Sequence, residues 1–195
     1  MIDDYENSDN WSQEQRDVLN KYTNFLYSNN YIDFSLIIFE TVKQIESNPE
    51  VGKYLSTLKY LVVDEYQDVN DLQEKLISHI AKYGTNICVV GDDDQTIYQF
   101  RGSNANNMIS FSERYADVHQ VYLDKNFRCA KGIVDVANNV IKNNKRRISK
   151  KMISTVNESN GNIKAERCFD EIDEFNRIAK KIIELHNSGI HYKEI

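Results

Sequence analysis

Short apolar runs alternate along the chain with amphipathic stretches of helical periodicity. Three of the runs predict strands, at residues 61–63, 86–90 and 118–123. The first run, Leu-Val-Val, is uninterrupted by Gly or Pro, which is typical of a strand buried on both faces of a parallel sheet. A weaker alternation predicts another strand at residues 163–169. Strands that alternate with helices indicate βαβ units, so we expect an α/β fold with a largely parallel sheet flanked by helices.

Apolar residues at helical spacing predict the helices. The stripe from Trp11 to Tyr27 stops at Ser28-Asn29-Asn30, and Asp33 is a typical cap for the next helix. That helix should end at Asn48-Pro49, because the residue before a proline is pushed out of helical geometry. Residues 1–10 are polar and are expected to form a loose arm, and further helices are expected at residues 51–58, 71–84 (with Asn70 or Asp71 as the cap), 105–115, 130–143 and 171–187.

Composition indicates an ordinary soluble protein. At 195 residues the chain is long enough for one large domain or one and a fraction. Its hydrophobic content of 41% is enough for a core, and 28% charged residues are typical of a soluble protein. No stretch approaches the roughly 18 apolar residues of a membrane span, and the acidic N-terminus is not a signal peptide. Cys88, Cys129 and Cys168 lack metal spacing and are expected to be reduced and inert, which favours a cytoplasmic protein. The net charge of −6 argues against non-specific coating of nucleic acid but is compatible with a local DNA groove.

The strand at residues 61–63 runs directly into Asp64-Glu65-Tyr66-Gln67-Asp68. In open α/β sheets ligands bind at the carboxyl ends of the strands, where Asp64 and Glu65 would lie. One carboxylate there can hold Mg²⁺, usually through water, while the other orients or deprotonates a water for attack on a phosphate. A strand that simply ends in solvated acids has the same pattern, so this motif alone does not decide the function.

The second strand ends in a richer motif, Gly-Asp-Asp-Asp-Gln-Thr-Ile-Tyr-Gln-Phe-Arg-Gly, at residues 91–102. Gln95 can bond a phosphate oxygen and a water at once, because its amide both donates and accepts. Tyr98 and Phe100 offer flat faces for bases and Arg101 offers a cation, the mixture that a single-strand groove uses. On composition alone, an aromatic loop that lines the core is an equal alternative.

A third candidate motif, Asn126-Phe127-Arg128, follows the expected strand at residues 118–123. Phe127 could stack on a purine while the Arg128 guanidinium reaches the γ-phosphate and neutralises charge in the transition state. Most Phe-Arg pairs in proteins are structural, so the motif is weak by itself.

Taken in order, the three motifs resemble the UvrD/Rep/PcrA family of superfamily 1 DNA helicases. The resemblance extends from Asp33-Phe34 to the helix containing Ala137-Asn138, and more faintly to the end of the chain. It implies part of a RecA-like P-loop NTPase motor, with residues 1–125 as the C-terminal part of the first motor domain and residues 126–195 as the start of the second. The implied activity is that of an ATP-dependent 3′→5′ helicase or translocase that uses ATP and Mg²⁺ on single-stranded DNA.

The resemblance also implies roles in nucleotide chemistry. Asp64 would hold Mg²⁺, and Glu65 would activate the hydrolytic water. Gln95 would sense the γ-phosphate, Phe127 would stack on adenine, and Arg128 would be an arginine finger. Phe127 stands where many members have Tyr, a change that keeps the π-face.

Three further roles concern DNA. Tyr98, Phe100 and Arg101 would contact the single strand, with Phe100 standing where relatives often have Trp. Gln67 and Asp68 belong to the first motif, and the resemblance assigns them only a supporting role.

The P-loop pattern G-x-x-x-x-G-K-[ST], whose backbone N–H groups and lysine cradle phosphates, does not occur in these 195 residues. Val51-Gly52-Lys53-Tyr54 has the Gly-Lys pair but neither the earlier Gly nor the following Ser or Thr. The family places its P-loop upstream of these motifs, so we expect a middle piece of a helicase that is inactive alone. A non-catalytic module that binds DNA or a protein partner is the competing hypothesis.

Residues 142–151 include Lys142, Lys145, Arg146, Arg147, Lys150 and Lys151. This basic stretch fits either a contact to DNA or phosphate or a solvated connector, and the connector is the more frequent outcome for such a charge run.

Overall fold

The computed structural model describes residues 11–156 and 163–195, and the chain divides into two compact units. Unit 1 runs to Leu123 and also includes Ile141–Lys151, whereas unit 2 comprises Asp124–Val140 and Met152–Ile195. The polar arm expected at residues 1–10 lies outside the described residues. None of the helices in the described part is long and apolar enough to cross a membrane.

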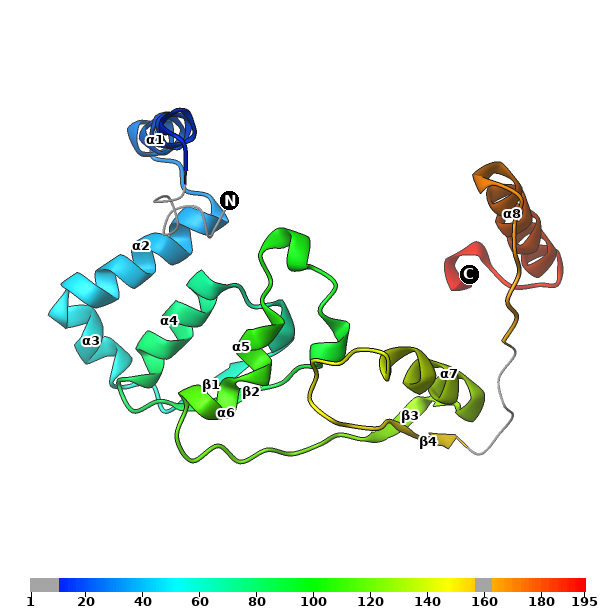
Figure 1. The fold of residues 1–195 in the computed structure, drawn as a ribbon. Helices are drawn as coiled ribbons and strands as arrows, with labels where there is room; N and C mark the ends of the chain where they lie inside the picture. Colours follow the sequence, from blue (N-terminus) through cyan, green and yellow to red (C-terminus); the bar gives the residue numbers. More distant parts are fainter. Residues whose placement is uncertain (1–10, 157–162) are drawn as a thin grey trace. The chain divides into compact units, whose positions relative to one another are not determined.

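The described part of each unit contains one pair of parallel strands (Figure 1). The elements of unit 1 are α1 (Gln13–Ser28), α2 (Phe34–Ser47), α3 (Pro49–Leu55), β1 (Tyr60–Val63), α4 (Asp71–Ala81), β2 (Asn86–Val89), α5 (Ala105–Ile109) and α6 (Phe111–Arg114), with short 3-10 turns η2 (Tyr66–Asp68), η3 (Asp93–Gln95) and η4 (Gln99–Arg101). The elements of unit 2 are β3 (Lys125–Ala130), α7 (Lys131–Ile141, whose last residue belongs to unit 1), β4 (Ile153–Val156), α8 (Glu171–Asn187) and η5 (Tyr192–Glu194). The α/β class with parallel strand pairing is therefore confirmed.

Side-chain caps explain where the helices of unit 1 begin. The Asp33 carboxylate accepts the Leu36 N–H at 2.7 Å, as expected for the first residue before α2. Asn70, rather than Asp71, caps α4 and exchanges reciprocal hydrogen bonds with Gln73. The short helix α3 begins at Pro49, two residues earlier than predicted, because proline is pre-organised for the first helical position.

Strands β1 and β2 are joined through α4 in a βαβ arrangement. They pair in parallel, with Tyr60 opposite Asn86 and Val63 opposite Val89. One face of the pair packs on the buried residues Tyr66, Val69 and Ile77, together with the partly buried Leu61, Val63, Ile87, Val89, Met108 and Phe111. Tyr66 and Val69 belong to the segment that follows β1, so this core holds that segment against the strands.

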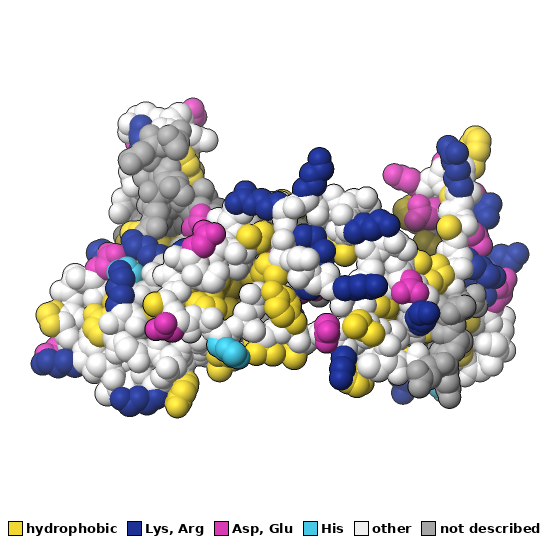
Figure 2. Space-filling model, turned by 60° about the horizontal axis from the view of Figure 1, so that its bottom comes forward, with side chains coloured by type: hydrophobic (Ala, Val, Ile, Leu, Met, Phe, Trp, Pro, Cys, Tyr) yellow, Lys and Arg dark blue, Asp and Glu magenta, His cyan; other side chains and the backbone are white. Residues whose placement is uncertain are grey.

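The prediction that the first strand is buried on both faces is wrong for the described residues. Tyr60 and Val62, whose side chains alternate with those of Leu61 and Val63, are exposed. The reason is that the described core covers only the face that carries Leu61 and Val63. Exposed hydrophobic side chains are also visible on the surface in Figure 2.

Two predicted strands are also wrong. Residues 118–123 and 163–169 form no strand, and the strands of unit 2 are Lys125–Ala130 and Ile153–Val156. Residues 118–123 have the apolar character of a strand but no partner in the described chain, whereas Lys125 and Asn126 pair with Ile153 and Ser154. The helix predicted at residues 105–115 is divided at Ser110 into α5 and α6.

Candidate nucleotide and nucleic-acid site

The candidate carboxylates lie at the carboxyl ends of β1 and β2, in unit 1. The two strand ends stay joined beyond the ladder, because Val90 N–H donates to the Val63 carbonyl at 2.8 Å and Tyr66 N–H donates to the Val90 carbonyl at 2.9 Å. Asp64 and Glu65 are both exposed at this edge. Glu65 has a left-handed backbone with φ 50°, a conformation that costs a residue with a side chain about 1–3 kcal/mol. The fold therefore holds this glutamate in a strained position, as is common at functional sites.

Gln67 bridges the two strand ends. Its side chain is buried, with the residue only 2% exposed. The amide Nε2 donates to Glu65 Oε2 at 2.8 Å, and Oε1 accepts the Asp92 N–H at 3.0 Å. Gly91 makes this bridge possible, since a Cβ there would lie 2.5 Å from Gln67 Oε1 and 3.1 Å from the Tyr66 nitrogen. Sequence reasoning assigned Gln67 no specific role, because only the register of β1 against β2 brings Asp92 to it.

Asp92 extends the bridge to Gln95. The Gln95 amide Nε2 donates to Asp92 Oδ2 at 2.8 Å, while Asp92 Oδ1 accepts the Asp94 N–H at 3.1 Å. A continuous hydrogen-bonded chain thus runs Glu65–Gln67–Asp92–Gln95. The structure thus connects Glu65 with Gln95, which lie 30 positions apart in the sequence. The sequence predicts related chemistry for these two residues.

Cations from the basic stretch hold the three adjacent aspartates. The Lys150 ammonium pairs with Asp93 and lies 2.9 Å from Asp92 Oδ1 and 3.0 Å from Asp94 Oδ2. Arg147 makes two bonds to Asp94, Nε to Oδ1 at 2.8 Å and Nη2 to Oδ2 at 2.6 Å. Neither a solvated connector nor a free phosphate contact describes Arg147 and Lys150. Their pairing with the aspartates was not predicted, because the partners lie more than fifty residues away in the sequence.

These contacts set the ionisation of the aspartates. Burial opposes the charged form of Asp92, but hydrogen bonds from Gln95 and Lys150 outweigh it and lower the Asp92 pKa. Burial likewise opposes ionisation of Asp94, and the bonds from Arg147 and Lys150 lower the Asp94 pKa. The three carboxylates lie within 4.8 Å of one another, an arrangement that could hold a metal ion, but Lys150 supplies the compensating charge.

Asp64 is the carboxylate that fits Mg²⁺. It is exposed at the end of β1, and among the described residues its one hydrogen bond is from the Glu65 N–H to Oδ1, at 2.9 Å. Magnesium bound with a nucleotide needs one or two carboxylates, and its other ligands are waters and phosphate oxygens. An exposed carboxylate satisfies that requirement.

The aromatic segment after η3 is exposed. Phe100 is 78% exposed, and its ring centroid lies 6.2 Å from that of Tyr98, with the two planes inclined at 57°. Such exposure does not support the alternative in which Phe100 lines the core. Arg101 is the last residue of η4, and its side chain lies outside the described part of the structure.

Phe127 and Arg128 belong to unit 2 and lie within β3, not after a strand as predicted. Asn126 Oδ1 accepts the N–H of Arg128 at 3.0 Å and that of Cys129 at 2.7 Å, where the pairing with β4 is irregular. Such an irregularity re-aims side chains. Both Phe127 and Arg128 are exposed.

A buried polar cluster behind the first motif was not predicted. Tyr66, which is fully buried, and Tyr115 both donate their hydroxyl groups to Glu74, and Arg114 forms an ion pair with the same carboxylate. Burial, with Glu74 as the next cause, raises the pKa of both tyrosines, so they remain protonated donors. The partners lie 8 to 41 residues from Glu74, so no local pattern reveals the cluster. It anchors the loop after β1 to α4 and α6.

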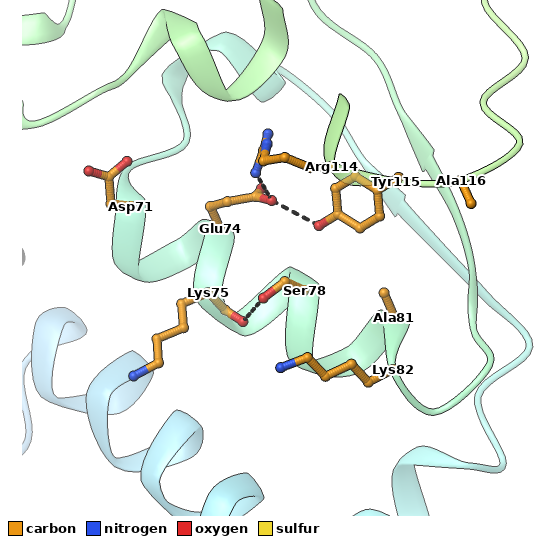
Figure 3. Close-up of a pocket in the computed structure, with 9 residues that line it drawn as sticks. All are labelled: Asp71, Glu74, Lys75, Ser78, Ala81, Lys82, Arg114, Tyr115 and Ala116. Atoms are coloured by element: carbon orange, nitrogen blue, oxygen red, sulfur yellow. Dashed lines mark hydrogen bonds and ion pairs between the residues drawn. The ribbon is translucent and has the colours of Figure 1, made fainter. Parts of the chain in front are cut away.

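A shallow pocket of about 580 Å³ lies beside this cluster, on α4 and residues 114–116. Figure 3 shows the side chains of Arg114 and Tyr115 directed at the Glu74 carboxylate, to which both are hydrogen-bonded. Its lining contains none of the predicted site residues. The pocket is therefore separate from the strand-end site.

Comparison with known proteins gives two family matches. The UvrD/REP helicase N-terminal domain matches residues 2–116, and the UvrD-like helicase C-terminal domain matches residues 121–195.

Curated relatives include several DNA helicases. The chain is 36% identical to the ATP-dependent DNA helicase PcrA of Staphylococcus epidermidis over 97% of its length, and 38% identical to PcrA of Bacillus subtilis over 92%. It is 36% identical over 89% of its length to a probable DNA helicase II homolog of Mycoplasma capricolum. The chain spans about a quarter of the length of these relatives, 24–26%.

Proposed function

Because the chain belongs to the UvrD/REP helicase family, we propose that it is part of an ATP-dependent DNA helicase that moves 3′→5′ on single-stranded DNA in repair, replication or recombination. Residues 1–125 belong in this proposal to the first RecA-like motor domain and residues 126–195 to the second. The gap between the two family matches, at residues 117–120, and the boundary of the compact units at Leu123 support that division. A cytoplasmic location follows from the proposed DNA substrate.

The observation that carries the proposal is the hydrogen-bonded chain Glu65–Gln67–Asp92–Gln95. It links the proposed general base at the end of β1 to the proposed phosphate sensor after β2. The two groups in the middle of this hydrogen-bonded chain are the buried Gln67 and the half-buried Asp92. Glu65 and Gln95, linked in this way, suit a reaction in which one residue acts on water and the other on the phosphate under attack.

In this mechanism Asp64 would hold Mg²⁺, and the ion would supply positive charge that offsets the negative charge of the phosphates. Glu65 Oε2 is already held by the Gln67 amide, so Oε1 is the oxygen available to orient and deprotonate the attacking water. Gln95 contacts the γ-phosphate through its exposed amide. The P-loop that binds the remaining phosphate oxygens is supplied from outside these 195 residues; we call the chain together with that segment the complete motor.

The residues of unit 2 act on the other parts of the nucleotide. Phe127 stacks on adenine and Arg128 compensates charge on the γ-phosphate as it is transferred. Their exposure on an irregular part of β3 supports these roles, since side chains on a regular strand within a covered sheet could not reach a ligand.

The test is ATP hydrolysis by the complete motor, with and without single-stranded oligonucleotides. Turnover should rise with single-stranded DNA and fall when Arg128 is replaced by Ala, with kcat affected more than KM. Movement should displace streptavidin from a biotin at the 5′ end of the strand and not from one at the 3′ end. Absence of DNA-stimulated turnover would instead favour the non-catalytic binding module.

A further inference from the structure

We propose that Arg147 and Lys150 are positioning residues, which hold the turn Asp92–Gln95 and thereby present Tyr98 and Phe100 to single-stranded DNA. The proposal rests on the proposed function, because it assigns a support to residues given a DNA role there. It gives the basic stretch a function other than direct contact with DNA.

The geometry is that of a closed ion-pair cluster. Lys150 contacts all three aspartates, and the Asp93 side chain is only 1% exposed. Arg147 meets Asp94 through two parallel bonds, the arrangement with the greatest directional specificity for an arginine and a carboxylate. The Ile148 N–H adds a bond to Asp93 Oδ2 at 2.8 Å. Together these contacts tie three successive residues of the turn to one short segment.

Charge explains why the turn needs this support. Three adjacent carboxylates repel one another, most strongly when they are turned away from water. Burial opposes the charge of Lys150 as well, yet its bonds to Asp93, Asp92 and Asp94 raise the Lys150 pKa. Without these cations the aspartates would turn outward to solvent, and the turn would lose the shape from which η4 continues.

The same geometry argues against a direct DNA contact for these two residues. An ammonium group has three donors, and those of Lys150 face three carboxylates. Arg147 uses its Nε–Nη2 edge for Asp94. Lys145, Arg146 and Lys151 of the same stretch are exposed, and they are the residues a phosphate would meet first.

The turn leads directly to the aromatic pair. Only Thr96 and Ile97 separate Gln95 from Tyr98, and Phe100 follows two residues later. A change in the direction of the turn therefore moves both rings. Stacking depends on ring placement, so binding of a single strand should report the state of the cluster.

The experiment measures binding of a fluorescein-labelled 20-nucleotide dT strand to the 195-residue chain by fluorescence anisotropy. Arg147→Ala and Asp94→Asn should each raise Kd, by roughly 5- to 140-fold, the range expected for the loss of one stacked base. Asp94→Asn is decisive, because removing a negative charge should tighten binding to DNA unless Asp94 acts by holding the turn. Arg167→Ala and Asp135→Asn make the same charge changes at exposed positions of unit 2 and serve as matched controls.

A second comparison separates positioning from general destabilisation. In a background that carries both Tyr98→Ala and Phe100→Ala, Arg147→Ala should have little further effect on Kd, because the two rings that it positions are already absent. An additive loss, unchanged Kd in both single variants, or tighter binding by Asp94→Asn overturns the inference while leaving the proposed function intact. No binding of the strand by the unsubstituted chain overturns the DNA assignment of the proposed function itself, and the inference with it.

Discussion

Gly91 shows how a single residue type supports the whole strand-end site. Its missing Cβ leaves room for Gln67 Oε1, and that oxygen accepts the Asp92 N–H. Asp64, Glu65 and Gln95 could be proposed from the sequence, because the strands that they follow are readable from apolar runs. Gln67 could not be identified as the bridge, because that role depends on which residue of β2 lies beside it.

Gly91→Ala should therefore displace the Gln67 side chain and leave buried polar groups unpaired. We expect the free energy of unfolding to fall by about 1–3 kcal/mol, measured by urea denaturation. The cost should be smaller in a Gln67→Ala background, where no side-chain oxygen opposes the new methyl group. Equal costs in the two backgrounds would show that the contact with Gln67 is not the cause.

Glu65→Gln in the complete motor tests the proposed general base. A base acts on the transition state, so kcat should fall by roughly 10²- to 10⁴-fold while the Kd for ATP stays nearly unchanged. Turnover is measured by phosphate release and affinity by equilibrium binding of a fluorescent ATP analogue. Glu50→Gln, at an exposed glutamate on α3, is the control. Unchanged turnover would remove Glu65 from the mechanism.

At the scale of elements, helices were more predictable than strands. Helices α1, α2, α4, α7 and α8 lie close to the residues where apolar periodicity and caps predict them. A helix closes its own hydrogen bonds, whereas a strand exists only beside a partner. The apolar residues 118–123 have no such partner among the described residues, and the more polar segment at residues 125–130 has one in β4.

The ion-pair cluster around η3 should make stability sensitive to acid. The pKa values of Asp92 and Asp94 are lowered in the folded chain, so their stabilising effect is present above the usual value of 3.8 and is lost as pH falls through the lowered values. Lys150→Met removes a cause of both shifts, so acid unfolding, followed by circular dichroism, should begin at higher pH. Lys53→Met, which breaks an exposed pair with Glu50, should leave the acid midpoint unchanged.

The aromatic segment at η4 gives a prediction that separates function from packing. Phe100→Ala should weaken binding of single-stranded DNA by about 1–3 kcal/mol, with little preference for sequence. Because Phe100 is exposed, the melting temperature should change little. Phe169→Ala, at an exposed position of unit 2, is the matched control. A lower melting temperature with normal DNA affinity would contradict the stacking role.

For the whole molecule, the order of three short motifs was more informative than the predicted architecture. Motif order indicated the family, which the two domain matches confirm. The return of Ile141–Lys151 to unit 1, after β3 and α7 have begun unit 2, was not predictable. It depends on pairing between aspartates and cations that lie more than fifty residues apart, and local patterns carry no such information.

The last prediction follows from the absence of a P-loop in the 195 residues. The chain alone should neither hydrolyse ATP nor bind it tightly, because its proposed contacts are limited to Mg²⁺, adenine and the γ-phosphate, whereas a P-loop supplies most phosphate contacts through backbone N–H groups. Phosphate release should stay at the buffer rate, and calorimetry at millimolar ATP should show little heat. Single-stranded DNA should still bind, since Tyr98 and Phe100 lie within unit 1. Steady turnover that Glu65→Gln abolishes would instead show that this chain contains a complete hydrolytic site.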